Sequence, residues 1–88
     1  MSSKYNLEFS NQAKKFLKGI RNKEILNDFA SAFEFLSLNP YAGKFLQANL
    51  KGYHSYRVHS IYRIIYKIFS HKLLIFIADI SHRKDSYR

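Results

Sequence analysis

Hydrophobic and polar residues alternate along much of the C-terminal third of the chain, at the two-residue period of a β-strand. In the stretch Tyr62–Ile68, hydrophobic side chains occupy the even positions, and Arg63 and Lys67 lie between them. Because successive side chains of a strand point to opposite faces, one face can enter a core while the other presents cations. Residues 56–59 alternate in the same way, and residues 73–80 are hydrophobic at nearly every position, as in a central strand. The pattern therefore predicts three strands in this region.

The first half of the chain has one alternating segment followed by two helical patterns. Residues 5–9 alternate apolar and polar side chains and are predicted to form a half-buried strand. Apolar residues then recur at spacings of three and four, which predicts two amphipathic helices. Ser10 or Asn11 is expected to cap the first helix and Asn22 the second, because their side-chain oxygens accept backbone N–H bonds. The second helix is expected to end at Asn39-Pro40, since proline disfavours helical geometry in the residue before it.

These elements predict an α+β fold of order β-α-α-β-β-β, in which a helical hairpin joined at 19–22 packs on an antiparallel-rich sheet. With 88 residues, the chain is expected to be a single domain, residues 1–88. Pro40 to Gly52 is the least regular segment, and no strand is predicted there. The helical residues expected in the core are Ala13, Phe16, Leu17, Ile20, Ile25, Phe29, Phe33 and Leu36.

Among the bulk properties of the chain, the net charge is the most informative about its partners. The formal net charge is +9, which favours a polyanionic partner such as nucleic acid or an acidic protein; a solvated lysine-rich surface is the alternative. The chain has no cysteine, which excludes disulfides and thiolate metal sites. The longest hydrophobic run is far shorter than the about 20 residues of a membrane-spanning helix, and the N-terminus lacks a signal-peptide pattern. A soluble, cytoplasmic protein without a membrane partner is therefore expected.

The candidate chemistry is cationic and aromatic. The four histidines do not form spaced pairs with carboxylates, and the chain lacks a glycine-rich phosphate loop and a nucleophile elbow. No metal and no cofactor is therefore predicted, and His54 and His71 are assigned to turns or to the surface. Basic and aromatic side chains bind phosphate, stabilise charge that develops on it, move protons and stack on unpaired bases. The candidates of these types are Arg57, His59, Arg63, His82, Arg83, Lys84 and Tyr87.

The same residues lie in segments that resemble the RelE/ParE superfamily of toxins from bacterial toxin–antitoxin pairs. The resemblance covers nearly the whole chain and is closest from Leu50 onward. It implies a microbial-ribonuclease-like fold, a cognate acidic antitoxin that neutralises the toxin, and a toxin–antitoxin hetero-oligomer. The segments that carry it are Asn39-Pro40, Leu50-Lys51-Gly52, Tyr56-Arg57-Val58, Tyr62-Arg63-Ile64-Ile65-Tyr66 and His82-Arg83-Lys84-Asp85-Ser86-Tyr87.

RelE-type members of this superfamily cleave mRNA in the ribosomal A site without a metal, using the 2′-hydroxyl of the RNA as nucleophile, and thereby inhibit translation. Under the resemblance, Arg63 and Arg83 match arginines that stabilise the phosphate in the transition state. Tyr87 matches a tyrosine that stacks on a base or takes part in proton transfer. Arg57 and His82 lie where RelE-type enzymes carry further basic or histidine residues, and they complete the expected catalytic set.

The resemblance also leaves alternatives open. The chain departs from the superfamily pattern where His59-Ser60-Ile61 replaces the usual glycine, so the register of the two flanking strands is not predicted. ParE-type relatives share the fold but inhibit DNA gyrase by protein binding, which is the second hypothesis. The third hypothesis, which rests on charge and fold alone, is a nucleic-acid-binding relative without catalytic activity. Arg63 and Lys67 are equally compatible with the solvent face of an amphipathic strand. Under the ribonuclease hypothesis the partners are the ribosome and its mRNA, and the residues expected to contact RNA are Lys51, His59, Lys67 and Lys84.

Overall fold

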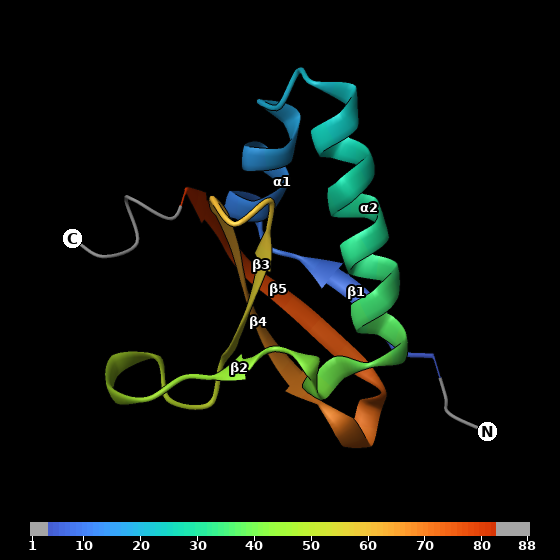
Figure 1. The fold of residues 1–88 in the computed structure, drawn as a ribbon. Coiled ribbons are helices and arrows are strands. Elements are labelled where there is room, and N and C mark those ends of the chain that lie inside the picture. Colours follow the sequence, from blue (N-terminus) through green and yellow to red (C-terminus); the bar gives the residue numbers. More distant parts are fainter. Residues whose placement is uncertain (1–3, 83–88) are drawn as a thin grey trace.

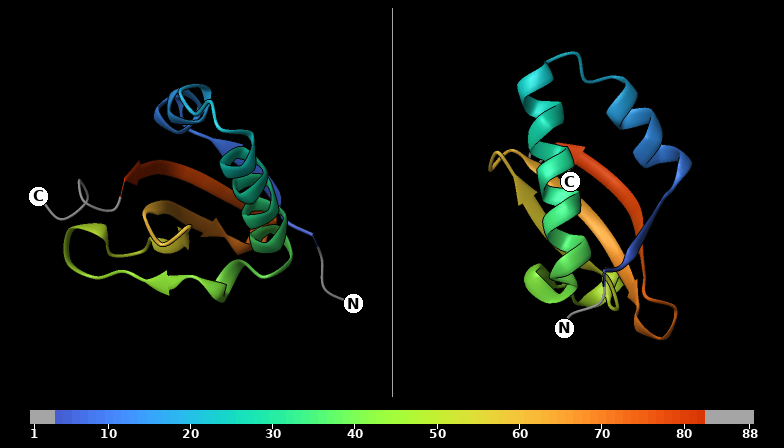
Figure 2. Two further views of the ribbon diagram at one scale, coloured as in Figure 1. Left: turned by 45° about the horizontal axis from the view of Figure 1, so that its top comes forward. Right: turned by 90° about the vertical axis from the view of Figure 1, so that its right-hand side faces the viewer.

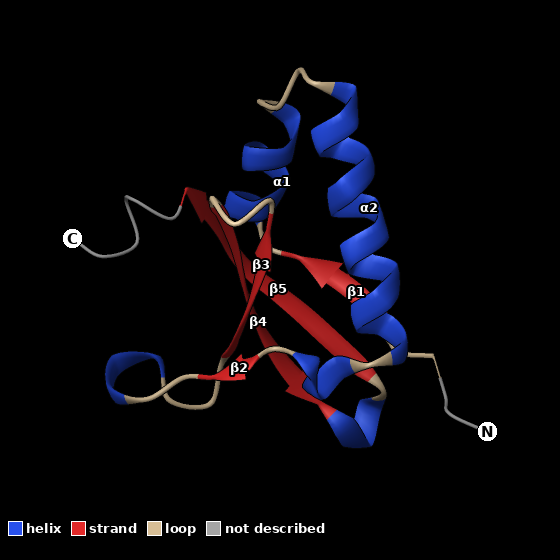
Figure 3. Cartoon of the chain, viewed as in Figure 1, coloured by secondary structure: helices blue, strands red, loops and turns tan. Residues whose placement is uncertain are grey.

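The helices and strands follow one another in the predicted order, with one additional short strand (Figures 1 and 3). The structure is a computed structural model that describes residues 4–82. Within that range no helix has the length and apolar character needed to cross a membrane. The elements are β1 (Asn6–Phe9), α1 (Asn11–Lys18), α2 (Lys23–Leu38), β2 (Lys44–Phe45), β3 (His54–Val58), β4 (Tyr62–Phe69) and β5 (Leu74–His82), with short 3₁₀ helices at Pro40–Ala42, Ala48–Leu50 and Ser70–Lys72.

The strands form one mixed sheet in the order β1-β5-β4-β3-β2. β1 pairs in parallel with β5, and the three other pairs are antiparallel. Both helices lie on one face of the sheet, where α1 packs mainly against β5, and α2 contacts β1 and β3 (Figure 2). We call the opposite face the outer face. The predicted α+β fold with an antiparallel-rich sheet is confirmed, although β2 was not predicted, because two residues are too few to show an alternating pattern.

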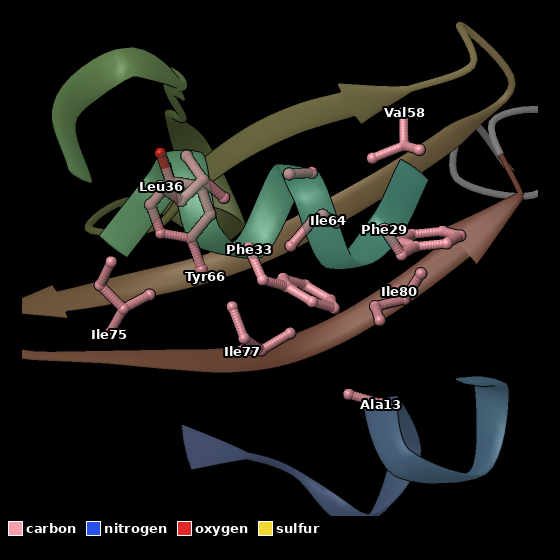
Figure 4. Close-up of a cluster of buried hydrophobic side chains, with 11 residues drawn as sticks. Ala13, Phe29, Phe33, Leu36, Val58, Ile64, Tyr66, Ile75, Ile77 and Ile80 are labelled. Atoms are coloured by element: carbon pink, nitrogen blue, oxygen red, sulfur yellow. The ribbon is translucent and has the colours of Figure 1, made fainter. Parts of the chain in front are cut away.

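The core lies between the helices and the inner face of the sheet (Figure 4). β4 contributes its even-numbered residues, of which Ile64 and Tyr66 are fully buried. α2 contributes the predicted aromatic stripe, in which the ring centroids of Phe29 and Phe33 lie 6.0 Å apart. The shorter α1 contributes one fully buried residue, Ala13. The hydrophobic periods of the sequence therefore predict the inner face correctly.

A β-bulge in β5 changes which of its residues face outward. In the register of β4 and β5, Ala78 has no partner residue. The extra residue shifts the alternation, so that Ile77 and Ile80 both join the core although they are three residues apart. Asp79 and Ser81 are therefore directed to the outer face.

Side-chain caps begin both helices at the predicted positions. Ser10 Oγ accepts a hydrogen bond from the backbone N–H of Ala13 (3.0 Å) and donates one to the carbonyl oxygen of the bulge residue Ala78 (2.6 Å). Asn22 Oδ1 accepts bonds from two backbone N–H groups in the first turn of α2. Ser10 therefore joins α1 to β5, whereas the Asn22 side chain bonds to the exposed first turn of α2, which it caps.

Replacing Ser10 by alanine is expected to lower the free energy of unfolding by about 2 kcal/mol, because the cap is lost and the Ala78 carbonyl is left without its hydroxyl donor. Asn22→Ala is the matched control and should cost about 1 kcal/mol, the usual value of a cap alone. Urea unfolding followed by circular dichroism measures both variants. Equal losses would contradict a stabilising role for the bond between Ser10 and Ala78.

His54 corrects the sequence analysis, because it is buried in β3 and lies neither in a turn nor at the surface. Its ring stacks on that of Tyr66 with 5.5 Å between centroids, and it makes edge contacts with the rings of Tyr41 and Phe45. Within residues 4–82 its buried Nδ1 has no hydrogen-bond partner. Burial lowers the pKa of His54 below the ordinary value of 6.5.

The protein is therefore expected to lose stability as the pH falls below 6.5, the ordinary pKa of histidine. In that range the unfolded chain binds a proton at His54 that the folded chain does not bind, so acid favours unfolding. The urea midpoint should decrease between about pH 7.5 and about pH 5.5, and it should decrease less in His54→Phe. His71→Phe, which changes an exposed histidine, is the control and should keep the wild-type pH dependence. An unaltered pH dependence in His54→Phe would contradict the assignment.

The hydroxyl of Tyr66 fixes the irregular segment after α2 to the sheet. It donates a hydrogen bond to the carbonyl oxygen of Pro40 (2.8 Å) and accepts one from the backbone N–H of Gly43 (3.1 Å). Burial raises the pKa of Tyr66 to about 12, so the hydroxyl is protonated near neutral pH and can make both bonds. A Cβ at Gly43 would overlap this hydroxyl and would lie 2.6 Å from the carbonyl oxygen of Ser55. Glycine is therefore required here because a side chain would not fit. The backbone conformation is not the reason, since any residue can adopt the φ of −76° at this position.

Candidate functional site

Two arginines lie side by side on the outer face. In the register of the sheet, Arg57 of β3 is the direct partner of Arg63 of β4, and Ser81 of β5 continues the row. Directly opposed residues of antiparallel strands have their Cβ atoms about 4.5–5.5 Å apart. Arg57 is exposed and Arg63 is half-buried. We call these three residues the arginine row; the sequence analysis predicted both arginines, and the structure brings them together.

The arginine row concentrates positive charge in a way that favours a bound anion. Like charges directly opposed across two strands repel each other, and negative charge nearby, such as a bound anion or the carboxylate of Asp79 on the same face, relieves the repulsion. Guanidinium groups present planar forks of N–H donors that match phosphate oxygens. The hydroxyl of Ser81 adds a group that donates or accepts a hydrogen bond. This arrangement is suited to hold a phosphate and to stabilise charge that develops on it.

The other end of the outer face combines cations with aromatic rings. Lys67 lies four residues along β4 from Arg63, or about 13 Å. Its Nζ is 5.6 Å from the ring centroid of Tyr53 and 5.5 Å from that of Phe69. Nζ of Lys72 lies 5.8 Å from the Phe69 centroid. Of the residues expected to contact RNA, Lys67 is therefore on the same face as the arginine row.

His82 lies on the helix side of the sheet, away from the arginine row. It is the cross-strand partner of Tyr62, and the two rings make an edge contact at 5.6 Å between centroids. Both side chains line a hollow beside the end of α1, together with Phe16 and Ile25. The structure therefore does not bring His82 together with the two arginines.

His59 also differs from its expected position. β3 ends at Val58, and His59 and Ser60 form the following turn with φ of 58° and 55°. Histidine is among the residues that tolerate this left-handed conformation, which the usual glycine adopts freely. His59 Nε2 contacts Oδ2 of Asp28 on α2, so the side chain is held on the helix side. The prediction that His59 continues the alternation of β3 is wrong, because the strand ends one residue earlier.

Four predicted residues remain. Lys51 is exposed and directly follows the 3₁₀ helix Ala48–Leu50. Arg83, Lys84 and Tyr87 lie outside the described residues, so their roles stay predictions. Within residues 4–82, no group of three histidine, aspartate, glutamate or cysteine side chains could hold a metal ion.

Four residues of the outer face were not among the predicted site residues, namely Tyr53, Phe69, Lys72 and Ser81. The alternation of β4 assigns Phe69 to the side of Arg63 and Lys67, so Phe69 could have been found from the pattern. Tyr53 directly precedes β3, and only its contact with Lys67 in the structure shows that it belongs to this face. Ser81 could not have been found, because the bulge that directs it outward has no signature in the sequence.

The sequence and the fold agree on the class of protein. Residues 7–87 match the family described as the ParE toxin of the type II toxin–antitoxin system, parDE. The chain belongs to this family, and it is a type II toxin of the RelE/ParE superfamily. Among curated protein sequences none matches the chain.

Solved toxin structures are similar over nearly the whole chain. A chain of the toxin–antitoxin complex RelBE2 from Mycobacterium tuberculosis has 30% identity and a TM-score of 0.76, and the similarity covers 92% of this chain and 100% of that one. The YoeB–YefM complex from Staphylococcus aureus gives 24% identity and a TM-score of 0.76, covering 91% and 98%. A double arginine-to-alanine mutant of Escherichia coli RelE in the free state gives 15% identity and a TM-score of 0.77, covering 97% and 90%. The Staphylococcus aureus and Escherichia coli structures are only 24% and 15% identical to this chain, so their similarity supports the fold alone.

Proposed function

We propose that this toxin is a RelE-like mRNA endoribonuclease that cuts mRNA in the ribosomal A site and so inhibits translation in the cytoplasm. The observation that carries the proposal is the arginine row, in which Arg57 and Arg63 are direct neighbours on the face opposite the helices. Negative charge grows on the phosphoryl oxygens when an RNA phosphodiester is attacked, and paired guanidinium groups stabilise such charge. The resemblance of Arg63 to the transition-state arginine of RelE-type enzymes supports the same assignment.

In the proposed reaction the 2′-oxygen of the RNA gives up its proton and attacks the adjacent phosphorus. The bond from phosphorus to the 5′-oxygen of the next nucleotide breaks, and that oxygen takes up a proton. The products carry a 2′,3′-cyclic phosphate and a 5′-hydroxyl. Arg57 and Arg63 would donate hydrogen bonds to the non-bridging oxygens, and Arg83 would add a further cation. We assign proton transfer to Tyr87 rather than to His82, because His82 faces the hollow beside α1.

We further propose that the chain is neutralised by an acidic antitoxin in a hetero-oligomer. The net charge of +9 favours such a partner. The similar chain from Mycobacterium tuberculosis is described in a complex of a toxin with its antitoxin.

The second candidate function is inhibition of DNA gyrase by protein binding. It is favoured by one observation, namely that the matching family is that of the ParE toxins. In this case the arginine row would be a contact surface for a protein, and no phosphodiester bond would be cut.

Two measurements distinguish the two functions. The first is primer extension on mRNA from cells that briefly express the protein, and the second is DNA supercoiling by gyrase with the purified protein added. The ribonuclease proposal predicts new RNA ends within translated codons, and unchanged supercoiling by gyrase in the presence of the purified protein. Intact mRNA together with inhibited supercoiling would replace the proposal by the gyrase function. Intact mRNA with unaffected gyrase would contradict both functions.

A further inference from the structure

Cations and aromatic rings form a second surface on the outer face, at the end away from the arginine row. Nζ of Lys67 lies between the rings of Tyr53 and Phe69, and Nζ of Lys72 lies over the ring of Phe69. Tyr53 and Phe69 are half-buried, so part of each ring remains accessible. We call these four residues the aromatic end.

A hollow adjoins the aromatic end on the same face. It encloses about 310 Å³ and is lined by Glu8, Phe69, Lys72, Leu74 and Phe76. In the register of the sheet, Phe76 is the partner of Lys67, and Leu74 is the partner of Phe69. Rings, apolar side chains and two ammonium groups are therefore contiguous, with Glu8 as the one carboxylate that lines the hollow.

We infer that the aromatic end is a stacking site for unpaired bases of single-stranded RNA. Proteins that grip single strands combine cations along the backbone with aromatic rings on which bases stack. The aromatic end supplies both kinds of group, and β4 connects it directly to the arginine row about 13 Å away. An RNA strand that places its scissile phosphate at Arg63 therefore has neighbouring nucleotides within reach of Tyr53 and Phe69. In this respect the inference rests on the proposed function.

The ammonium group of Lys67 does not prevent stacking. Lys67 and both rings are half-buried, so its cation–π contacts are similar in strength to the stacking of a base, and a base competes with the ammonium for the ring face. The displaced ammonium remains beside the base, where it can pair with a phosphate of the strand. The same residues thus serve the base and the backbone of one nucleotide.

An acidic peptide fits this surface less well than RNA does. An extended peptide gains most of its affinity by pairing with the backbone at a sheet edge. Lys67 and Phe69 of the aromatic end lie on the face of β4, an interior strand paired on both sides, Tyr53 directly precedes the interior strand β3, and Lys72 lies in the 3₁₀ helix Ser70–Lys72. Flat rings bordered by ammonium groups match a base and its phosphate, whereas an acidic side chain would use only the ammonium groups.

A single tryptophan tests the inference, because the chain has none. Tyr53→Trp places an indole at the aromatic end, and Tyr41→Trp places one at an exposed tyrosine that contacts His54 on the helix side. The ligand is a single-stranded 2′-O-methyl oligoribonucleotide, which lacks the free 2′-hydroxyl needed for cleavage. We expect it to quench the indole at position 53 by stacking and to leave the indole at position 41 unchanged. Equal quenching of both indoles, or of neither, would overturn the inference.

Affinity for the same oligonucleotide provides the second measurement. Phe69→Leu should weaken binding at least about fivefold, the lower end of the usual effect of losing one stacked base. Phe45→Leu is the matched control, since Phe45 is an exposed phenylalanine of β2 that contacts His54, and it should bind like wild type. Unchanged affinity in Phe69→Leu would overturn the inference. Polyglutamate serves as a probe for an acidic protein. If it quenched the indole at position 53 as strongly as the RNA does, the inference would also be overturned.

Failure of the proposed ribonuclease function and failure of the stacking site give different results. If the protein cuts no mRNA but the oligonucleotide still quenches the indole at position 53, the stacking site stands and the ribonuclease assignment falls. If mRNA is cut but the fluorescence of the indole does not change, the ribonuclease assignment stands and the stacking site is wrong. Arg63→Ala in the Tyr53→Trp background should slow cleavage about a hundredfold or more and retain the quenching.

Discussion

Replacing Arg63 by alanine is expected to slow mRNA cleavage about a hundredfold to a thousandfold, the usual effect of removing one donor that stabilises transition-state charge. Arg63 is the central residue of the arginine row, with Arg57 and Ser81 as its partners on either side. Its guanidinium group offers paired N–H donors to the phosphoryl oxygens, and alanine offers none. The loss should fall mainly on kcat, because the charge develops in the transition state.

The measurement is cleavage of an mRNA on programmed ribosomes by purified protein. Arg63→Lys should recover part of the rate, since lysine keeps the charge and loses the planar fork. Arg21→Ala is the matched control, because Arg21 is an exposed arginine in the connection between the helices and lines the hollow on the helix side. A folded Arg63→Ala variant that cleaves at the wild-type rate would contradict the assignment of Arg63.

Replacing Gly43 by alanine is expected to lower the free energy of unfolding by about 3–5 kcal/mol, through overpacking and the loss of buried hydrogen bonds. The new Cβ would overlap the hydroxyl of Tyr66 and press on the carbonyl oxygen of Ser55. To make room, β2 must move away from β3, which breaks the bond that the Tyr66 hydroxyl donates to Pro40 and the bond that it accepts from Gly43.

Urea unfolding measures this effect, and Gly19→Ala is the control. The nearest atom to a Cβ at Gly19 is the carbonyl oxygen of Phe16, at 3.4 Å, and φ is −80°, so this variant should change stability by no more than about 0.5 kcal/mol. In a Tyr66→Phe background the overlap with the hydroxyl is absent, and Gly43→Ala should cost less than in the wild type. Additive losses in the double variant would show that the hydroxyl is not the cause.

The fold could be predicted from the sequence because its main elements are long enough to show a period. The aromatic stripe of α2 and the alternation of β4 both identify the residues that face the core, including Phe29, Phe33, Ile64 and Tyr66. The caps at Ser10 and Asn22 follow from local chemistry, which a sequence displays directly.

The rest depends on pairing between strands, which no local pattern records. β2 has two residues, and the bulge at Ala78 alters the face of Ser81 without any change in composition. The polar residue His54 is buried because its strand partner is Tyr66, with which its ring stacks.

The same reason limits how much of the candidate site could be predicted. The sequence identified Arg57 and Arg63, but only the register shows that they are direct neighbours. It also grouped His59 and His82 with them, whereas the structure holds both histidines on the helix side, His59 against Asp28 and His82 against Tyr62.

The central claim is that this toxin cuts RNA with the 2′-hydroxyl of the RNA itself as nucleophile. It is tested most directly with two ribosome-bound mRNAs that differ in one atom, the 2′-oxygen at the cleavage site. We expect the all-ribose mRNA to be cut into products with a 2′,3′-cyclic phosphate and a 5′-hydroxyl, and the mRNA with one 2′-deoxynucleotide to stay intact. Cleavage of both mRNAs at the same site, or of neither, would contradict the account.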